Sequence, residues 1–227
     1  MSKRVIITGA SRGIGFELVR LFSNAGHEVI ALSRKLDSLE AMERNTVLAI
    51  STDLTSTDSI EDTAKTIKNK WDHVDIVIHN AGMLVNKPFD QLTNTDFQNC
   101  YAVNVFGVAA LTQSLLPILS KDSHVIAISS MGGIQGSAKF PGLAAYSSAK
   151  AAVITLFELL AEEYKENGPS FNTLALGAVQ TEMLEEAFPG YKAPLQPDDM
   201  ATYIMNFALT GNQFYNGKVL QVSSSTP

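Results

Sequence analysis

A tyrosine and a lysine four residues apart are the first candidates for catalysis in this sequence. Tyr146 and Lys150 form a Y-x-x-x-K pattern, and residues at this spacing share one face of a helix, with Cβ atoms about 5–6 Å apart. A free tyrosine has a pKa of about 10, too high for efficient proton transfer at neutral pH. At an effective dielectric constant of about 20, a neighbouring ammonium favours the phenolate by about 3 kcal/mol, or roughly two pKa units. The pair therefore predicts a general acid and base, although the pattern alone is common on protein surfaces.

Two further kinds of polar side chain suit the same chemistry. Ser129 and Ser130 end a predicted strand shortly before the tyrosine, where a hydroxyl can bind a substrate oxygen. Asn104 lies within a predicted helix among apolar neighbours, a poor position for asparagine unless its amide is satisfied. One interpretation is a kinked helix, since Gly107 follows. The other is a side chain that holds a water molecule relaying protons to Lys150.

A glycine-rich turn near the N-terminus predicts a phosphate-binding site. Gly9, Gly13 and Gly15 form a G-x-x-x-G-x-G pattern between an apolar strand and an amphipathic helix. Glycines let the backbone approach a pyrophosphate, and the helix N-terminus supplies N–H groups and a partial positive charge. A tight turn without a ligand is the alternative, but the strand–turn–helix context favours a nucleotide. The turn residues assigned to the nucleotide are Gly9, Ser11, Arg12, Gly13, Ile14 and Gly15.

The end of the second predicted strand favours NADP(H) over NAD(H). Enzymes that prefer NAD usually carry an acidic residue here, which binds the ribose 2′-hydroxyl. This sequence has Ser33 followed by Arg34, and Arg12 lies in the glycine turn. Two guanidinium groups without a carboxylate suit a 2′-phosphate, whereas a solvated loop is the alternative for Arg34. Asp53 is a candidate acceptor for the adenine amino group, with a helix N-cap as its alternative role.

The elements that must position these residues alternate between strands and helices. The predicted strands are Val5–Thr8, Glu28–Ser33, Thr46–Ile50, Ile76–His79, Val125–Ser129, Asn172–Leu176 and Lys218–Val222. The predicted helices are Ile14–Ala25, Leu36–Arg44, Ser56–Lys70, Thr95–Leu119, Ser147–Glu166 and Pro197–Leu209. Continuous apolar strands are typical of a parallel sheet covered on both faces. We therefore expect a single-domain α/β protein over residues 1–227, with a Rossmann-like doubly wound parallel sheet of about seven strands and its ligands at the carboxyl ends of the strands.

Composition and charge argue against several other classes of protein. The chain has 227 residues, of which 45% are hydrophobic and 18% charged, as is typical of folded globular proteins. A net charge of −6 argues against a nucleic-acid partner. The single cysteine, Cys100, cannot form an intrachain disulfide, and the histidines lack metal-ligand spacing. The sequence contains neither a secretory segment nor an apolar run of membrane-spanning length, so we expect a cytoplasmic protein without a metal or a membrane partner.

The motifs together resemble those of the short-chain dehydrogenase/reductase family over nearly the whole chain. The matching pieces are Thr8 to Gly15, Asp53-Leu54, Asn80-Ala81-Gly82, Asn104, Ile128-Ser129-Ser130, Tyr146 to Lys150, and Asn172 to Thr181. The resemblance implies hydride transfer between NADP(H) and a small-molecule carbonyl or secondary alcohol. It also implies that Tyr146 is the acid/base and that Ser130 binds the substrate oxygen. Lys150 would lower the tyrosine pKa and contact the ribose, and Asn104 would hold a water molecule.

The resemblance extends the cofactor site beyond the glycine turn. The further residues assigned to it are Ser33, Arg34, Asp53, Leu54, Asn80, Ala81, Gly82, Tyr146, Lys150, Gly177, Val179 and Thr181. The sequence departs from the family pattern at His79, where we expect a packing or hydrogen-bonding role, and at Leu176, which replaces a usual proline. The loop Met131–Ala145 is enlarged, and its apolar side chains suit substrate contact and lid packing equally. The segment Glu182–Gln196 is a short lid candidate.

Two predicted helices, Thr95–Leu119 and Ser147–Glu166, carry more apolar surface than one buried face requires. In the family these helices form a subunit interface, so we expect a homodimer or homotetramer, with burial inside the same chain as the alternative. Two other functions share parts of the pattern. One is a non-catalytic NADP(H)-binding sensor or scaffold, which does not need the full set of proton-transferring residues. The other is a sugar-nucleotide epimerase or dehydratase, which the glycine spacing and the chain length disfavour.

Overall fold

Within residues 2–223, seven strands pair in parallel in one sheet, in the order β3-β2-β1-β4-β5-β6-β7. The strands are β1 (Arg4–Thr8), β2 (Glu28–Ser33), β3 (Val47–Ser51), β4 (Ile76–His79), β5 (His124–Ser130), β6 (Ser170–Leu176) and β7 (Lys218–Val222). The computed structural model describes residues 2–223; Met1 and residues 224–227, which the predicted domain includes, lie outside the described part. The doubly wound parallel sheet predicted from the apolar runs is confirmed.

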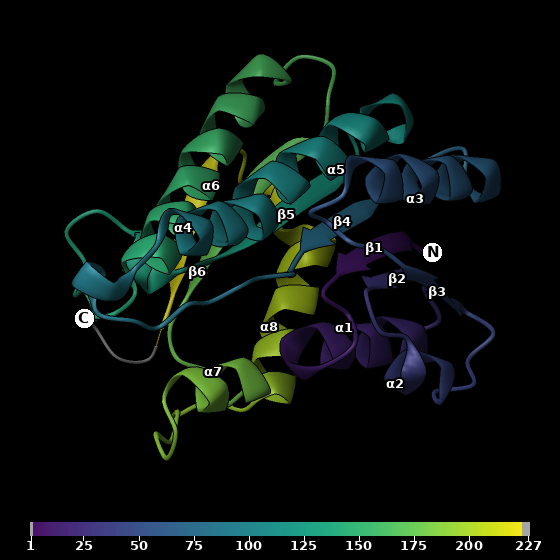
Figure 1. The fold of residues 1–227 in the computed structure, drawn as a ribbon. Coiled ribbons are helices and arrows are strands. Elements are labelled where there is room, and N and C mark those ends of the chain that lie inside the picture. Colours follow the sequence, from purple (N-terminus) through teal and green to yellow (C-terminus); the bar gives the residue numbers. More distant parts are fainter. Residues whose placement is uncertain (1, 224–227) are drawn as a thin grey trace.

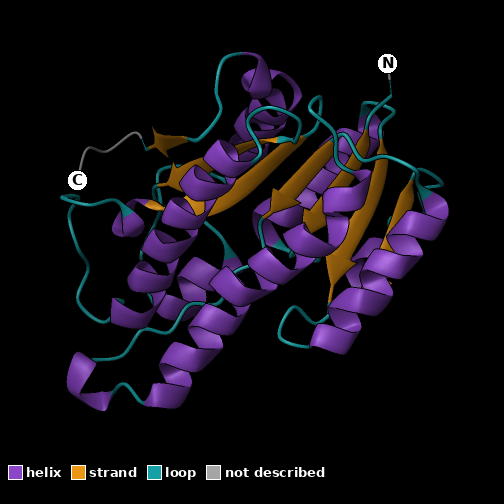
Figure 2. Ribbon diagram, turned by 90° about the horizontal axis from the view of Figure 1, so that it is seen from above, coloured by secondary structure: helices purple, strands orange, loops and turns teal. Residues whose placement is uncertain are grey.

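Helices cover both faces of the sheet (Figure 1 and Figure 2). One face carries α1 (Gly13–Asn24) and α8 (Pro197–Thr210), which pack against each other, with α2 (Asp37–Glu40) beside them. The other face carries α3 (Thr57–Lys70), α4 (Asn94–Tyr101), α5 (Gly107–Leu115) and α6 (Ala144–Glu163). Each layer encloses its own apolar core, centred on residues such as Phe22 on one face and Phe157 on the other. Because both faces are covered, β4 is buried along its whole length.

The helix predicted over Thr95–Leu119 is interrupted. Between α4 and α5 the residues Ala102–Phe106 form a π-helical turn, and Leu116–Ile118 form a 3₁₀ turn. The interruption has local causes, because Asn104 bonds to the backbone of a neighbouring loop and Gly107 packs directly on Leu54, where a Cβ would lie 2.5 Å from the carbonyl oxygen. The sequence therefore indicated a kink at this position but not its form.

Further helix boundaries differ from the predictions, and α6 begins and ends three residues earlier than the predicted Ser147–Glu166. The helix predicted over Leu36–Arg44 covers only α2, since Glu43 adopts a left-handed φ of 47°. The predicted lid Glu182–Gln196 contains an additional helix, α7 (Glu182–Ala187), which begins where the Thr181 hydroxyl accepts a hydrogen bond from the Leu184 amide. This helix lies near the N-terminal end of α1, where the glycine turn enters the helix (Figure 1).

Candidate active site

Tyr146 and Lys150 lie one turn apart near the start of α6. Lys150 is only 4% exposed, and its Nζ atom lies 5.7 Å from the centre of the Tyr146 ring. The ammonium donates a hydrogen bond of 2.8 Å to the carbonyl oxygen of Ile128 on β5. A backbone carbonyl therefore fixes the lysine beside the tyrosine.

Burial acts on both members of this pair and favours their neutral forms. It raises the pKa of Tyr146 to about 12, against the opposite effect of a hydrogen bond with Ser130. It lowers the pKa of Lys150 to about 8. The pKa of Tyr146 therefore lies above its ordinary value of 10 and not below it, opposite to the direction expected from the ammonium alone. Tyr146 is therefore held as a phenol, the form that can donate a proton.

The two serines at the end of β5 have different partners. Ser129 is buried, and its hydroxyl donates a hydrogen bond of 2.8 Å to the carbonyl oxygen of Lys150. Ser130 is partly exposed, and its hydroxyl accepts a hydrogen bond from the Gly132 amide while contacting Tyr146. Ser129 thus ties the strand to α6, whereas Ser130 faces the tyrosine.

Asn104 uses both ends of its amide on the backbone of Met83. Its Nδ2 atom donates to the Met83 carbonyl at 2.8 Å, and its Oδ1 atom accepts from the Met83 amide at 3.1 Å. Gly82 lies between Asn104 and Lys150, because a Cβ on it would be 3.3 Å from Oδ1 and 3.5 Å from Nζ. Asn104 therefore positions the segment after β4 next to the lysine. Its water-holding role remains a prediction.

The glycine turn packs directly on the segment after β4. Gly9 and Gly13 have left-handed φ angles of 66° and 54°, and a Cβ on Gly9 would lie 2.7 Å from Cα of Ala81. The Asn80 side chain donates hydrogen bonds of 3.1 Å to the carbonyl oxygens of Thr8 and Gly9. Asn80 and Ala81 therefore hold the turn in place.

The turn suits an anion at the start of α1. Gly15 leaves no room for a side chain, since a Cβ would clash with the Gly9 carbonyl oxygen. No side chain caps this helix and its first turn contains no acidic residue, so its first N–H groups are available to an anion. Ile14 contributes only backbone here, because its side chain packs against the core. These residues fit the pyrophosphate of a dinucleotide.

Serine hydroxyls connect the turn to the end of β2. Ser33 donates a hydrogen bond of 2.8 Å to the Ser11 hydroxyl, and Ser38 of α2 donates one of 2.6 Å to the Ser11 carbonyl oxygen. Arg34 is exposed beside them. Sequence reasoning missed Ser38, because nothing in its type or spacing distinguishes it from other loop serines.

Two of the residues assigned to the adenine side have structural partners. The Oδ1 atom of Asp53 accepts hydrogen bonds from the amide and the hydroxyl of Thr55, which hold the pKa of the carboxyl below its ordinary value. The adenine contact of Asp53 stays a prediction. Leu54 is buried beneath Gly107 in the core, so it can offer only its backbone.

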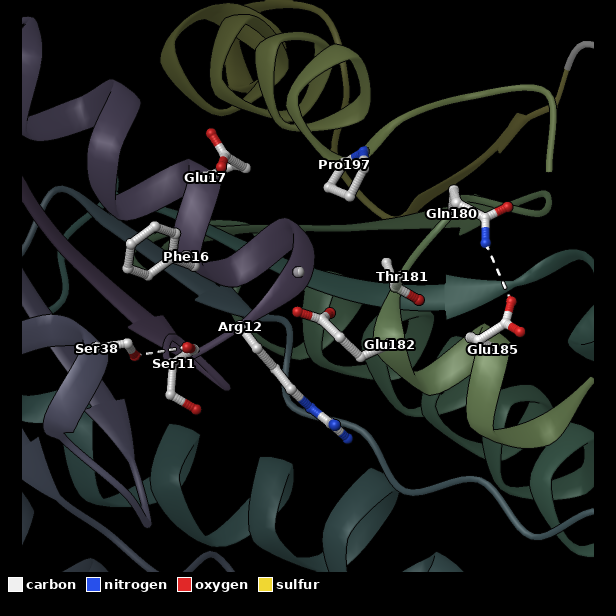
Figure 3. A pocket seen from close by; sticks show the side chains of 11 residues that line it. Ser11, Arg12, Phe16, Glu17, Ser38, Gln180, Thr181, Glu182, Glu185 and Pro197 are labelled. Carbon is white, nitrogen blue, oxygen red and sulfur yellow. Dashed lines mark hydrogen bonds between the residues drawn. The ribbon is translucent and has the colours of Figure 1, made fainter. Parts of the chain in front are cut away.

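Of the three assigned residues after β6, two make structural contacts and one lines a pocket. The Gly177 amide donates to the Val222 carbonyl oxygen, and Val179 is buried and pairs with Leu195. Thr181 alone of the three assigned residues lines a pocket of about 510 Å³ between the glycine turn and α7 (Figure 3).

Arg12 extends from the turn away from Ser11 and Ser38 (Figure 3). Its guanidinium pairs with the carboxylate of Glu186 on α7 at 2.5 Å. Arg12 and Arg34 thus do not share one partner in this structure. Glu182 and Glu186 were missed as site residues, although the acidic composition of the predicted lid was the available signal.

His79 has the hydrogen-bonding role expected of it. It is buried, its Nε2 atom lies 2.9 Å from the Thr112 hydroxyl, and its ring packs edge-on against Phe157. Burial lowers its pKa to about 3, so it is neutral. Within residues 2–223, no group of three or more histidine, cysteine, aspartate or glutamate side chains is placed to hold a metal ion.

Comparison with known proteins decides which family this geometry represents. The sequence profile described as short chain dehydrogenase matches residues 3–192. The chain belongs to the short-chain dehydrogenase family. This dehydrogenase is 32% identical over 224 residues to an uncharacterized oxidoreductase of Staphylococcus saprophyticus, covering 91% of this chain and 89% of that protein. It is also 32% identical over 188 residues to an oxidoreductase of Botryotinia fuckeliana, covering 80% and 68%.

Solved structures share the fold of this short-chain dehydrogenase. A short-chain dehydrogenase of Burkholderia cenocepacia in complex with NADP has a TM-score of 0.87 and 22% identity, with 98% of this chain and 97% of that chain covered. A 3-ketoacyl-(acyl-carrier-protein) reductase of Brucella melitensis with NADH has a TM-score of 0.86 and 23% identity, covering 98% and 97%. These two solved structures share the fold of this chain, and one of them holds NADP and the other NADH.

Proposed function

We propose that this short-chain dehydrogenase transfers hydride between NADP(H) and a small-molecule carbonyl or secondary alcohol, with Tyr146 as acid and base. The observation that carries the proposal is the placement of Tyr146, Ser130 and Lys150 beside the segment that packs on the glycine turn. A nucleotide in the turn and a substrate at the tyrosine would therefore meet at one edge of the sheet.

The bound nicotinamide supplies or accepts the hydride. Tyr146 donates its phenolic proton to the substrate oxygen in reduction and takes it back in oxidation. The Ser130 hydroxyl binds the same oxygen and orients it toward the tyrosine. Burial keeps Tyr146 protonated, with a pKa of about 12, so the protein without ligands holds the form that donates a proton. Lys150 provides positive charge behind the tyrosine and an ammonium for the ribose hydroxyls, while Asn104 keeps the Gly82 segment beside it.

The preference for NADP(H) rests on the charges around the end of β2. Ser33 stands where an acidic residue would bind a ribose 2′-hydroxyl, and Arg34 is exposed next to it. Arg12 starts from the adjacent turn, and both guanidiniums suit a 2′-phosphate. Asp53 is the proposed adenine contact.

We further propose a cytoplasmic homodimer or homotetramer. By length and composition, the helical segments 94–118 and 144–163 could each cross a membrane, but core helices of soluble proteins pass the same test. Each packs one side on the sheet, and their outer surface exposes Phe106 and Leu159. A second copy covering these side chains explains the apolar surface without a membrane.

The first experiment is a substrate screen in which the absorbance of the reduced cofactor reports turnover. NADPH and NADH are each mixed with a panel of aldehydes, ketones and quinones, and the loss of reduced cofactor is measured. We expect turnover with NADPH and slower turnover with NADH, and the best substrates define the pocket. Failure with both cofactors, combined with tight NADPH binding, would favour the sensor or scaffold function instead.

A further inference from the structure

The charged contact between the glycine turn and α7 uses an arginine that the proposed function also needs. Arg12 Nη1 lies 2.5 Å from Glu186 Oε1, and Nη2 lies 3.3 Å from Oε2. The contact is therefore a two-bond, fork-shaped pair, the geometry in which guanidinium best recognises a carboxylate or a phosphate. Glu186 satisfies the same N–H groups that a 2′-phosphate would use.

The electrostatic surroundings strengthen this pairing. The hydrogen bond and charge of Glu186, with a further effect from the Glu182 charge, raise the pKa of Arg12 despite its partial burial. The same ion pair lowers the pKa of Glu186, so both groups are charged at neutral pH. Glu182 also approaches the start of α1, since its Oε2 atom would be 3.3 Å from a Cβ on Gly13. Helix α7 thus presents carboxylates to the surface on which the dinucleotide's phosphates are expected.

The pair is exposed enough to be exchanged. The Arg12 side chain is 49% exposed and that of Glu186 is 63% exposed, and ion pairs of this kind contribute little net stability. A phosphate carries more charge than a carboxylate and offers more acceptor oxygens. A 2′-phosphate can therefore displace Glu186, but part of its interaction with Arg12 is offset by the contact that it breaks.

We infer that Glu186 is a specificity-determining residue that weakens selection for the 2′-phosphate by competing for Arg12, and that 2′-phosphate binding releases α7 from the glycine turn. This inference rests on the proposed function, because it takes Arg12 to contact NADP(H). It assigns a role to the lid that is separate from contact with the substrate.

The test compares two nucleotides that differ only in the 2′-phosphate, adenosine 2′,5′-bisphosphate and AMP. Their Kd values are measured by calorimetry at constant ionic strength for the intact protein and for Glu186→Gln. We expect Glu186→Gln to tighten binding of the bisphosphate by about two- to fivefold, the range of an exposed ion pair, and to leave AMP unchanged. Hydrogen exchange of the α7 amides should rise when the bisphosphate binds the intact protein, whereas AMP should have no such effect.

Two variants control this measurement. Glu185→Gln removes the same charge from the same helix, but Glu185 contacts Gln180 and the Gly190 amide rather than Arg12. It should change the bisphosphate-to-AMP affinity ratio much less. In an Arg12→Gln background, Glu186→Gln should have no effect on the ratio.

Three results would overturn the inference: an unchanged ratio in Glu186→Gln, an equal change in Glu185→Gln, or the same change without Arg12. If neither the intact protein nor Glu186→Gln binds the bisphosphate more tightly than AMP, the inference that Glu186 competes with the 2′-phosphate for Arg12 is also wrong. NADH-dependent turnover of a carbonyl would then still support the oxidoreductase function, so the two failures are distinguishable.

Discussion

The proton-transfer side and the nucleotide side of the site hold their cations in different ways. Lys150 is 4% exposed and bonds to a backbone carbonyl of the central sheet. Arg12 has a side chain that is 49% exposed, and it bonds to a carboxylate on a helix 174 residues away in the sequence. The lysine's position is therefore set by the core, whereas the arginine's position is set by a contact that a ligand can replace.

This difference separates chemistry from selectivity. Changes on the buried side should alter turnover and the free energy of unfolding, because desolvation governs both pKa values there. Changes on the exposed side should alter the choice of cofactor and leave the fold unchanged, because exposed charges contribute little to stability.

Replacing the tyrosine tests the buried side most severely. Tyr146→Phe removes the proton donor and keeps the ring, so kcat/KM for a carbonyl should fall by about 10²–10⁴-fold. The Kd of NADPH, measured by fluorescence titration, should stay within about twofold, because the substitution removes a proton donor needed in the transition state and keeps the ring that lies beside the proposed cofactor site. Tyr164→Phe, at the other end of α6, is the matched control and should retain turnover. Activity of Tyr146→Phe close to that of the unmodified protein would remove Tyr146 from the mechanism.

Replacing the lysine should lower activity and raise stability together. Burial lowers the Lys150 pKa from 10.5 to about 8, so folding is penalised wherever the unfolded lysine is charged. That penalty is complete below pH 8 and declines as the pH rises from 8 toward 10.5. Lys150→Met should therefore raise the free energy of unfolding by about 1–3 kcal/mol at neutral pH, with a smaller gain at pH 10. Urea unfolding at both pH values measures this. A loss of stability at neutral pH would show that the hydrogen bond to Ile128 outweighs the burial penalty.

The buried side is also the part that the sequence predicted best. The Y-x-x-x-K spacing fixes the pair on one helical face, and continuous apolar runs fix the parallel sheet that carries it. Both depend on residues close together in the chain. The form of the Asn104 kink was not predictable, because it depends on the backbone of Met83 on another segment.

The exposed side was less predictable, because its contacts join segments that lie far apart in the sequence. Arg12 was identified from its place in the turn, but its partner Glu186 depends on how α7 folds back over the turn. Sequence periodicity cannot predict a helix as short as Glu182–Ala187, or which of its carboxylates reaches the arginine. The resemblance already favoured Ser130 over Ser129, and the structure adds that the Ser129 hydroxyl bonds to the Lys150 carbonyl while Ser130 contacts the tyrosine.

Within the proton-transfer side, the two neighbouring serines at the end of β5 allow catalysis and stability to be separated. Ser130→Ala should lower kcat/KM by about 10–100-fold without changing the unfolding midpoint, because one hydrogen bond to the substrate oxygen is lost. Ser129→Ala should lower the free energy of unfolding by about 1 kcal/mol, because the Lys150 carbonyl loses a buried donor. Its kcat/KM should change much less. The opposite pattern in kinetics and denaturant unfolding would exchange the two roles.

Charge reversal at the end of β2 should give the smallest effect and act on selectivity alone. Arg34→Asp removes a guanidinium from the expected 2′-phosphate and supplies the carboxylate that binds a ribose 2′-hydroxyl. The ratio of kcat/KM for NADPH to that for NADH should fall by about tenfold at low salt, and by less at high salt because Arg34 is exposed. The thermal midpoint should not change. An unchanged ratio would mean that Arg34 does not bind the 2′-phosphate. Selection would then depend on Arg12, and therefore on how readily Glu186 releases it.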